Sequence, residues 1–163
     1  MAVTSVRPFV PEFDHGWAAA MLAADFGGTR QARRGEVLDT LDLPGLVAEE
    51  DGMPVGLLSY RIEGKRCELF FIAAHQQWRG VGTAMVEALV ARAREAACTK
   101  IWLVTTNDNL GALRFYQRRG FDLVALYPGA VAESRRLKPG IPQVGADGIA
   151  RRDELELERR LVP

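Results

Sequence analysis

The sequence has few residues of the kinds that bind metals or form disulfides. It contains two cysteines, Cys67 and Cys98, and two histidines, His15 and His75, in 163 residues. The cysteines lack metal-ligand spacing, and they fall where a strand and a helix end are expected. This pattern favours buried free thiols over a disulfide or a metal site, so no metal is expected.

An excess of charge of one sign and long apolar segments are also missing. Lys plus Arg and Asp plus Glu both number 21, so no basic field would draw the chain to nucleic acid or to an anionic membrane. No apolar run approaches the ~20 residues of a membrane span. The first residues lack the charged-then-apolar order of a signal peptide. We therefore expect a cytoplasmic protein without nucleic-acid or membrane partners.

The composition that remains is that of an ordinary globular protein. With 48% hydrophobic residues, the chain is long enough to bury a sizeable core, and residues 1–163 are expected to form one domain. Helical spacing of apolar residues predicts helices at 13–24, 29–40, 85–97 and 109–119. Residues 128–150, rich in Gly and Pro, are expected to form a long irregular loop. Apolar runs and alternation predict strands at 3–7, 46–49, 55–62, 67–74, 101–104, 121–127 and 154–158.

A glycine-rich turn joins one of these strands to a helix. Residues 80–82, Gly-Val-Gly, follow an apolar run at 69–74 and precede a helical stripe. The first turn of a helix has N–H groups without intrahelical partners and carries the positive end of the macrodipole, and glycines let backbone approach a phosphate. Arg79 can add a positive charge. The turn therefore indicates a phosphate site, with tight packing as the alternative.

Two spaced motifs lie in the middle of the chain. Gln77, Gly80 and Gly82 fit the pattern Q/R-x-x-G-x-G/A, and Asn109, Ala112, Tyr116, Gly120 and Phe121 fit N-x-x-A-x-x-x-Y-x-x-x-G-F. Together they resemble the pyrophosphate motif and a later motif of the GNAT superfamily of acyl-CoA-dependent N-acetyltransferases. The resemblance implies a GNAT-like α+β fold, with a mixed and mostly antiparallel sheet of six or seven strands and helices on both faces. It also implies acetyl-CoA as the cofactor and allows a homodimer.

The resemblance further implies which residues hold the cofactor. In the family the two central strands splay apart, and a backbone N–H near residues 72–74 polarises the thioester carbonyl. Asn109 would orient the pantetheine arm, although helix capping explains it equally well, and Asn107 is a second choice. The implied cofactor-binding residues are Ile72, Ala73, Ala74, Gln77, Trp78, Arg79, Gly80, Val81, Gly82, Thr83, Asn107, Asn109, Ala112 and Tyr116.

Tyr116 is the predicted general acid. Its position in the later motif implies that the phenol, with a pKa near ~10, donates a proton to a thiolate leaving group with a pKa near ~8.5. The alternative is a tyrosine that simply packs its ring in the core.

Glu68 is the predicted general base. An acceptor amine with a pKa near ~10.4 must lose a proton before it attacks. Glu68 lies on the strand that leads to the glycine turn, and strict alternation would place it on the same strand face as Ile72. A solvated or hairpin-paired glutamate is the alternative, and His75 and Glu133 are weaker substitutes.

The acceptor is expected near the long loop. Glu133, Arg135 and Arg136 are the predicted substrate-binding residues, and the cations favour an anionic acceptor. A solvated charged surface is the alternative, and Arg33 and Arg34 are similar candidates.

The sequence as a whole predicts transfer of an acetyl group from acetyl-CoA to the primary amine of a small molecule, by direct attack in a ternary complex. A covalent acetyl-enzyme is not expected, because neither cysteine has a neighbouring signal for activation. Two alternatives remain open. One is an acetyltransferase for protein N-termini or lysines, and the other is a non-catalytic acyl-CoA sensor module.

Overall fold

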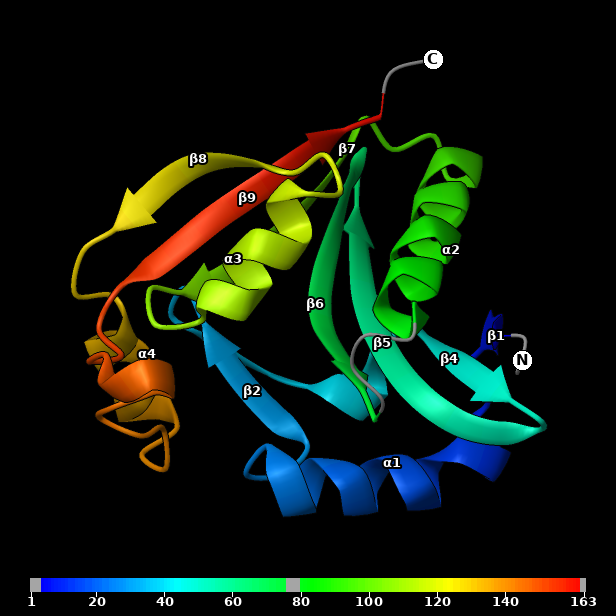
Figure 1. Ribbon diagram of the computed structural model, residues 1–163, viewed down its shortest axis with the longest axis horizontal. Helices are drawn as coiled ribbons and strands as arrows, with labels where there is room; N and C mark the ends of the chain where they lie inside the picture. Colours follow the sequence, from blue (N-terminus) through cyan, green and yellow to red (C-terminus); the bar gives the residue numbers. More distant parts are fainter. Residues whose placement is uncertain (1–3, 76–79, 162–163) are drawn as a thin grey trace.

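A computed structural model describes residues 4–75 and 80–161, and most of its strands form one sheet (Figure 1). The seven strands of that sheet follow the order β1-β4-β5-β6-β7-β9-β8. Strands β6 and β7 run parallel, and the other neighbouring pairs are antiparallel. This confirms the expected α+β fold with a mixed, mostly antiparallel sheet. The bounds are β1 Thr4–Pro8, β4 Gly45–Glu50, β5 Met53–Glu63, β6 Arg66–Ala74, β7 Lys100–Thr106, β8 Asp122–Tyr127 and β9 Glu154–Arg160.

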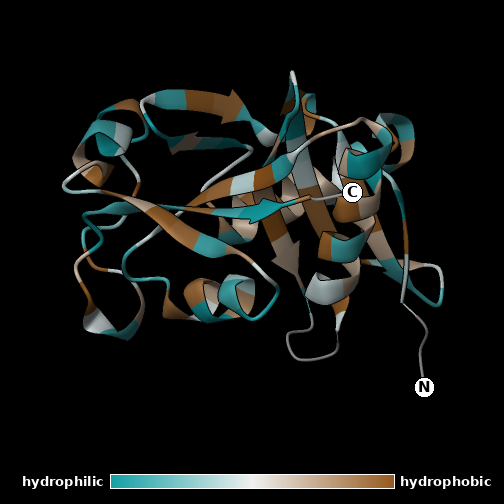
Figure 2. Ribbon diagram, turned by 90° about the horizontal axis from the view of Figure 1, so that it is seen from above, coloured by the Kyte–Doolittle hydropathy of each residue, from teal (hydrophilic) through white to brown (hydrophobic). Residues whose placement is uncertain are grey.

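Helices cover both faces of the sheet, as expected. Helix α1, Pro11–Asp25, packs on one face, and α2, Val81–Glu95, and α3, Leu110–Gln117, pack on the other (Figure 1). Figure 2 shows that the strands at the centre are largely hydrophobic, whereas many turns at the periphery are hydrophilic. The smaller core cluster joins α1 to the sheet through Ala18, Met21, Leu22, Val47, Leu57 and Phe71. The larger cluster lies under α2 and α3 and includes Met85, Val86, Leu89, Tyr116 and Phe121.

No described helix has the length and hydropathy of a membrane span.

Helix α3 begins and ends beside the two residues that the sequence predicts for these roles, Asn109 and Gly120. The side-chain oxygen of Asn109 accepts a hydrogen bond from the backbone N–H of Ala112 at 3.1 Å, which caps the helix. Gly120, just after the helix, has a φ of 85°. Because that backbone conformation favours glycine, the chain turns there into β8.

The predicted helix at 29–40 is wrong. That segment forms a hairpin of β2, Arg30–Arg33, and β3, Glu36–Asp39, followed by a short 3₁₀ turn, Thr40–Asp42. Arg34 and Gly35, between the strands, have φ angles of 49° and 74°. Two successive positive φ values are typical of the tight two-residue turn that matches strand twist, so the hairpin is set by its turn rather than by apolar spacing.

The long loop after β8 is also more regular than predicted. It contains helix α4, Val131–Leu137, and a short 3₁₀ turn, Ala146–Gly148. Helix α4 contacts both β2 and β3. Lys138, just after α4, donates hydrogen bonds to the carbonyl oxygen of Phe26 and to the side-chain oxygen of Gln31, each at 3.0 Å. The loop therefore holds the hairpin against the rest of the protein.

A β-bulge in β6 decides which of its residues share a face. The pairing of β5 with β6 skips Phe70. As a result Leu69 and Ile72 both pack into the larger cluster, whereas Phe70 packs into the smaller one on the other face. Glu68 precedes the bulge and lies opposite Leu69 in the strand alternation. The prediction that Glu68 and Ile72 share a face is therefore wrong.

Asp14, at the start of α1, is a buried carboxylate whose loss we expect to weaken the fold. It accepts two hydrogen bonds from Arg7, at 2.7 and 2.8 Å, one from the backbone N–H of Val10 and one from the indole of Trp17. The Arg7 bonds are the main reason that the pKa of Asp14 falls from 3.8 to about 2. A lowered carboxyl pKa adds stability above the unfolded value, and that stability is lost as the pH falls from about 4 to about 2.

We expect Asp14→Asn to reduce the free energy of unfolding at pH 7 by about 2 kcal/mol, and by much less near pH 2. Urea unfolding at the two pH values measures this difference. Asp51→Asn, in an exposed turn, is the matched control and should change little at either pH. A loss for Asp14→Asn that is equally large at both values would contradict the electrostatic account.

Candidate active site

The parallel strands β6 and β7 separate partway along their length. Their pairing covers Arg66 with Lys100, Cys67 with Ile101 and Glu68 with Trp102, and in the described part of the chain it goes no further. Both strands continue beyond that point, β6 to Ala74 and β7 to Thr106. The separation of the two central strands that the family resemblance implies is therefore present.

A cavity of about 250 Å³ lies where the strands separate. Its described lining comes from the β2–β3 hairpin, from both separating strands and from the N-cap of α3. The lining residues are Gln31, Ala32, Arg33, Glu68, Phe70, Phe71, Val104 and Asn109. Two residues predicted for different roles, Glu68 and Asn109, are thus brought to one cavity.

Tyr116 lies in the core cluster on the α2–α3 face. It is 5% exposed, and its ring centroid lies 5.2 Å from that of Phe115 and 5.4 Å from that of Phe121. Ile72 and Ala112 pack against the same cluster. Burial raises the pKa of the Tyr116 phenol well above its usual value, so the hydroxyl keeps its proton at neutral pH.

The glycine turn begins α2, as predicted. Gly80, the N-cap, has a φ of 79°, and no described atom lies within 4 Å of the position that a Cβ would take. At Gly82 a Cβ would come within 3.1 Å of the Phe115 ring, so this glycine also allows α3 to approach α2. Val81 is buried beneath the turn. Three predicted cofactor residues, Gln77, Trp78 and Arg79, lie outside the described residues.

Arg119 is a residue that sequence reasoning missed at this end of α2. Its guanidinium donates hydrogen bonds to the Thr83 hydroxyl at 2.6 and 2.9 Å and to the carbonyl oxygen of Phe115 at 2.8 Å. It also lies 3.7 Å from the centroid of the Phe115 ring. The only signal in the sequence is a basic residue just before Gly120, and that signal does not indicate a contact with Thr83.

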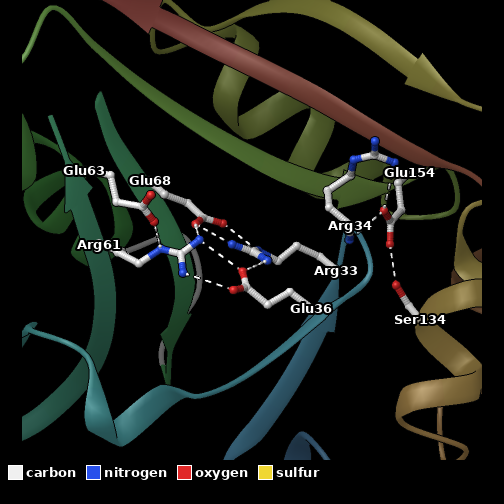
Figure 3. A network of polar contacts seen from close by, with 8 residues as sticks. All are labelled: Arg33, Arg34, Glu36, Arg61, Glu63, Glu68, Ser134 and Glu154. Carbon is white, nitrogen blue, oxygen red and sulfur yellow. Dashed lines mark hydrogen bonds and ion pairs between the residues drawn. The ribbon is translucent and has the colours of Figure 1, made fainter. Parts of the chain in front are cut away.

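Glu68 is buried and held by guanidinium groups. It is 2% exposed and accepts two hydrogen bonds of 2.6 Å from Arg33 and one of 3.3 Å from Arg61 (Figure 3). Glu36 bridges the same two arginines, at 2.9 and 3.1 Å. Both oxygens of Glu68 therefore accept charge-assisted hydrogen bonds.

A second buried carboxylate holds the other side of the hairpin. Glu154, at the start of β9, is 2% exposed and accepts hydrogen bonds from the Ser134 hydroxyl at 2.7 Å and from the backbone N–H of Arg34 at 3.0 Å. Figure 3 shows that Arg33 and Arg34 leave the hairpin in different directions, one toward Glu68 and the other toward Glu154. Glu154 thus joins three segments far apart in the sequence: the hairpin, α4 and β9.

Asn107 and Asp108 fasten the chain after α4 to the end of β7. The side-chain oxygen of Asn107 accepts from the backbone N–H groups of Arg152 and Asp153, each at 3.0 Å, and its amide nitrogen donates to a backbone carbonyl at 2.9 Å. Burial, the largest single influence, acts to raise the pKa of Asp108, but hydrogen bonds from Arg151 and Thr106 and the charge of Arg151 together lower that pKa. At Gly145 a Cβ would collide with the Asp108 carboxylate, so only glycine fits there.

The predicted substrate-binding residues of the long loop, residues 128–150 (the late loop), lie on α4. Arg136 is largely exposed and pairs with Glu133 at 3.1 Å. Arg135 donates hydrogen bonds to the carbonyl oxygens of Ile141, Pro142 and Arg151, at 3.0 to 3.2 Å. None of the three is among the described residues that line the cavity. Their contact with a substrate stays a prediction.

The two cysteines are free and buried, as predicted. Burial raises the pKa of the Cys67 thiol to about 12. A thiol with that pKa is almost entirely protonated at neutral pH and is a poor nucleophile.

Comparison with known proteins places this architecture in a family. The sequence profile of the Acetyltransferase (GNAT) family matches residues 11–121. The Bacillus subtilis protein YdhI is 43% identical over 115 residues, which are 70% of this chain and 72% of YdhI. An IAA acetyltransferase from Bacillus cereus superposes with a TM-score of 0.75 at 21% identity, over 98% of this chain and 100% of that one. A GNAT family acetyltransferase from Elizabethkingia anophelis, solved with acetyl-CoA bound, gives a TM-score of 0.71 at 16% identity, over 97% and 98% of the two chains. The family profile covers more than half of the chain, which therefore belongs to the GNAT family of acetyltransferases.

Proposed function

We propose that this protein transfers the acetyl group of acetyl-CoA to the primary amine of a small molecule, by direct attack in a ternary complex. The observation that carries the proposal is the separation of β6 and β7 beyond Glu68. Tyr116 lies on one face of the sheet and the cavity on the other. Beyond Glu68 no hydrogen bonds between β6 and β7 separate the two faces in the described chain. A donor bound on the first face can then meet an acceptor bound on the second.

The start of α2 fits the phosphates of acetyl-CoA. The left-handed conformation of Gly80 leaves the backbone open on the side where a Cβ would stand. Helix α2 has 15 residues, and the N–H groups of its first turn and its positive dipole end favour an anion. Arg119 adds a cation beside Thr83. Acetyl-CoA, when bound, supplies an activated acetyl thioester.

The remaining cofactor contacts follow from the shape of β6. Beyond Glu68 the backbone groups on the β7 side of β6 have no ladder partner on β7 in the described chain. We propose that an N–H of residues 72–74 points at the thioester carbonyl from this edge and polarises it. Asn109 and Ala112, at the start of α3, contact the pantetheine arm in this proposal, whereas Asn107 secures the late loop.

Tyr116 and Glu68 are the residues proposed for proton transfer, and they lie on opposite faces of the sheet. Tyr116, on the donor side, holds a proton that it can give to the leaving thiolate. Glu68, on the acceptor side, is the carboxylate in the described lining of the cavity. Because both of its oxygens already accept hydrogen bonds from Arg33 and Arg61, water is the second candidate for the base.

A small acceptor is favoured over a protein chain because the hairpin stands on the acceptor side. A peptide needs an open groove, but here β2 contributes to the cavity wall. Glu154 bonds to the turn of the hairpin, and Lys138, after α4, bonds to Gln31 in β2. A non-catalytic sensor would require the glycine turn but neither Tyr116 nor a carboxylate at the cavity. A cytoplasmic location and a homodimer stay predictions from the sequence.

The test is thiol release from acetyl-CoA in the presence of a panel of primary amines. The panel contains alkyl and arylalkyl amines, a peptide with a free N-terminus and a peptide with an internal lysine. We expect thiol release that requires both the protein and a small amine, with little release from either peptide. Calorimetric titration with acetyl-CoA runs in parallel. Tight binding of acetyl-CoA without amine-dependent thiol release would instead identify the sensor module.

A further inference from the structure

The cavity at the strand separation contains two charged groups in its described lining, and they neutralise each other. Arg33 is 9% exposed and Glu68 is 2% exposed, and two hydrogen bonds of 2.6 Å join them. Arg33 donates a further bond to Glu36, and Glu68 accepts one from Arg61. A second charge on a substrate would therefore lack a free counter-ion here, because Arg33 and Glu68 are already paired with each other.

The neutral polar side chains of the same lining, Gln31 and Asn109, also form hydrogen bonds within the protein. The amide of Gln31 donates to the carbonyl oxygens of Phe26 and Gly28, and its oxygen accepts from Lys138. The oxygen of Asn109 accepts from a backbone N–H of α3. The bonds of Gln31 would have to break before that side chain could solvate a charged group on the substrate, and the amide of Asn109 is neutral, so it cannot act as a counter-ion.

The other walls are apolar. Ala32, Phe70, Phe71 and Val104 line the cavity from the hairpin and from the two separating strands. The guanidinium carbon of Arg33 lies 5.2 Å from the centroid of the Phe70 ring, which holds the Arg33 side chain beside the aromatic wall. A volume of about 250 Å³ is at the small end for ligand sites, which commonly measure about 300–1,000 Å³.

We infer that the acceptor is a compact primary monoamine with an uncharged, apolar body, and that this cavity rejects amines that carry a second charge. This inference rests on the proposed acetyl transfer. It departs from the anionic acceptor favoured by the arginines of the late loop, because those arginines are not among the described cavity residues. The physical basis is that burying a charge without a partner is unfavourable, whereas an alkyl or aryl group gains from contact with apolar walls.

Two matched pairs of amines test the inference on the wild-type protein. Phenethylamine and phenylalanine have the same aromatic body, and the amino acid adds a carboxylate. Pentylamine and cadaverine have the same carbon chain, and the diamine adds a second ammonium group. With acetyl-CoA saturating, we expect kcat/KM to be about tenfold or more higher for phenethylamine than for phenylalanine, and for pentylamine than for cadaverine.

The outcomes separate the inference from the proposed function. A smaller preference in either pair, or a preference for the charged member, contradicts the inference while leaving acetyl transfer intact. Thiol release with neither phenethylamine nor pentylamine contradicts the inference. Absence of thiol release with every amine and peptide of the wider panel, although acetyl-CoA binds, contradicts the proposed function.

A variant of the cavity wall provides a second test. Val104→Asp places an unpaired carboxylate in the cavity, and Val104→Thr, of nearly the same shape, is the uncharged control. We expect Val104→Asp to raise the kcat/KM for cadaverine relative to that for pentylamine by about tenfold. Val104→Thr should keep the wild-type ratio of these two values. Circular dichroism checks that both variants fold. A ratio unchanged by Val104→Asp in the folded protein would show that the acceptor does not occupy this cavity.

Discussion

Replacing Tyr116 with phenylalanine should lower kcat by about 100-fold or more, the usual size of a general-acid contribution, while acetyl-CoA affinity stays nearly unchanged. The substitution removes one hydroxyl and keeps the ring, so the contacts with Phe115 and Phe121 are retained. The raised pKa of the buried phenol means that its proton is present throughout the neutral range. Steady-state thiol release and calorimetric titration with acetyl-CoA measure the two quantities.

Tyr127→Phe is the matched control for this experiment. The Tyr127 hydroxyl donates to Glu156 at 3.0 Å on the edge of the sheet, away from the core cluster that contains Tyr116. We expect this control to retain nearly full kcat. A loss of less than about tenfold for Tyr116→Phe, well below the usual size of such a contribution, would mean that the thiolate obtains its proton elsewhere and that Tyr116 is a packing residue.

Arg33→Met should destabilise the fold by about 3–5 kcal/mol, because it leaves the Glu68 carboxylate buried and short of its main partner. Arg61 remains, at 3.3 Å, but it is also paired with Glu36 and Glu63. The loss is a large part of the roughly 5–15 kcal/mol that stabilises a typical domain. Urea unfolding followed by circular dichroism measures it.

A second substitution separates charge burial from lost packing. The double variant Arg33→Met with Glu68→Gln removes the uncompensated charge and should recover more than half of the lost stability. Arg136→Met, at an exposed surface pair, is the control and should cost less than about 0.5 kcal/mol. A double variant no more stable than Arg33→Met alone would mean that the side chain of Arg33 stabilises the hairpin by packing and not by pairing with Glu68.

The elements around the glycine turn could be predicted because each has a strong local signal. The apolar run of β6, the N-cap at Asn109 and the stop at Gly120 all lie where the sequence places them. These signals depend on residues close together in the chain. That is why the fold class, the glycine turn at the start of α2 and the ends of α3 followed from the sequence.

The surroundings of the cavity were harder to predict because their structure depends on contacts between distant residues. The hairpin did have one local signal, Gly35 after Arg34, which is typical of a tight two-residue turn. Helix α4 has seven residues and no capping side chain, so little in its sequence marks it. The bulge at Phe70 has no glycine or proline beside it, and it changed the face assigned to Glu68. The pairing of Arg33 with Glu68 spans 35 residues and has no local sequence signal.

Mass spectrometry of a single turnover tests the central proposal most directly. The protein is mixed with acetyl-CoA labelled in the acetyl group and with phenethylamine, and the reaction is stopped at intervals. The account predicts that labelled N-acetyl-phenethylamine and free CoA appear together in equal amounts, with no labelled acetyl group on the protein at any time. Labelled acetyl on the protein before the product forms would contradict direct attack, and CoA binding without any acetylated amine would contradict acetyl transfer to this class of acceptor.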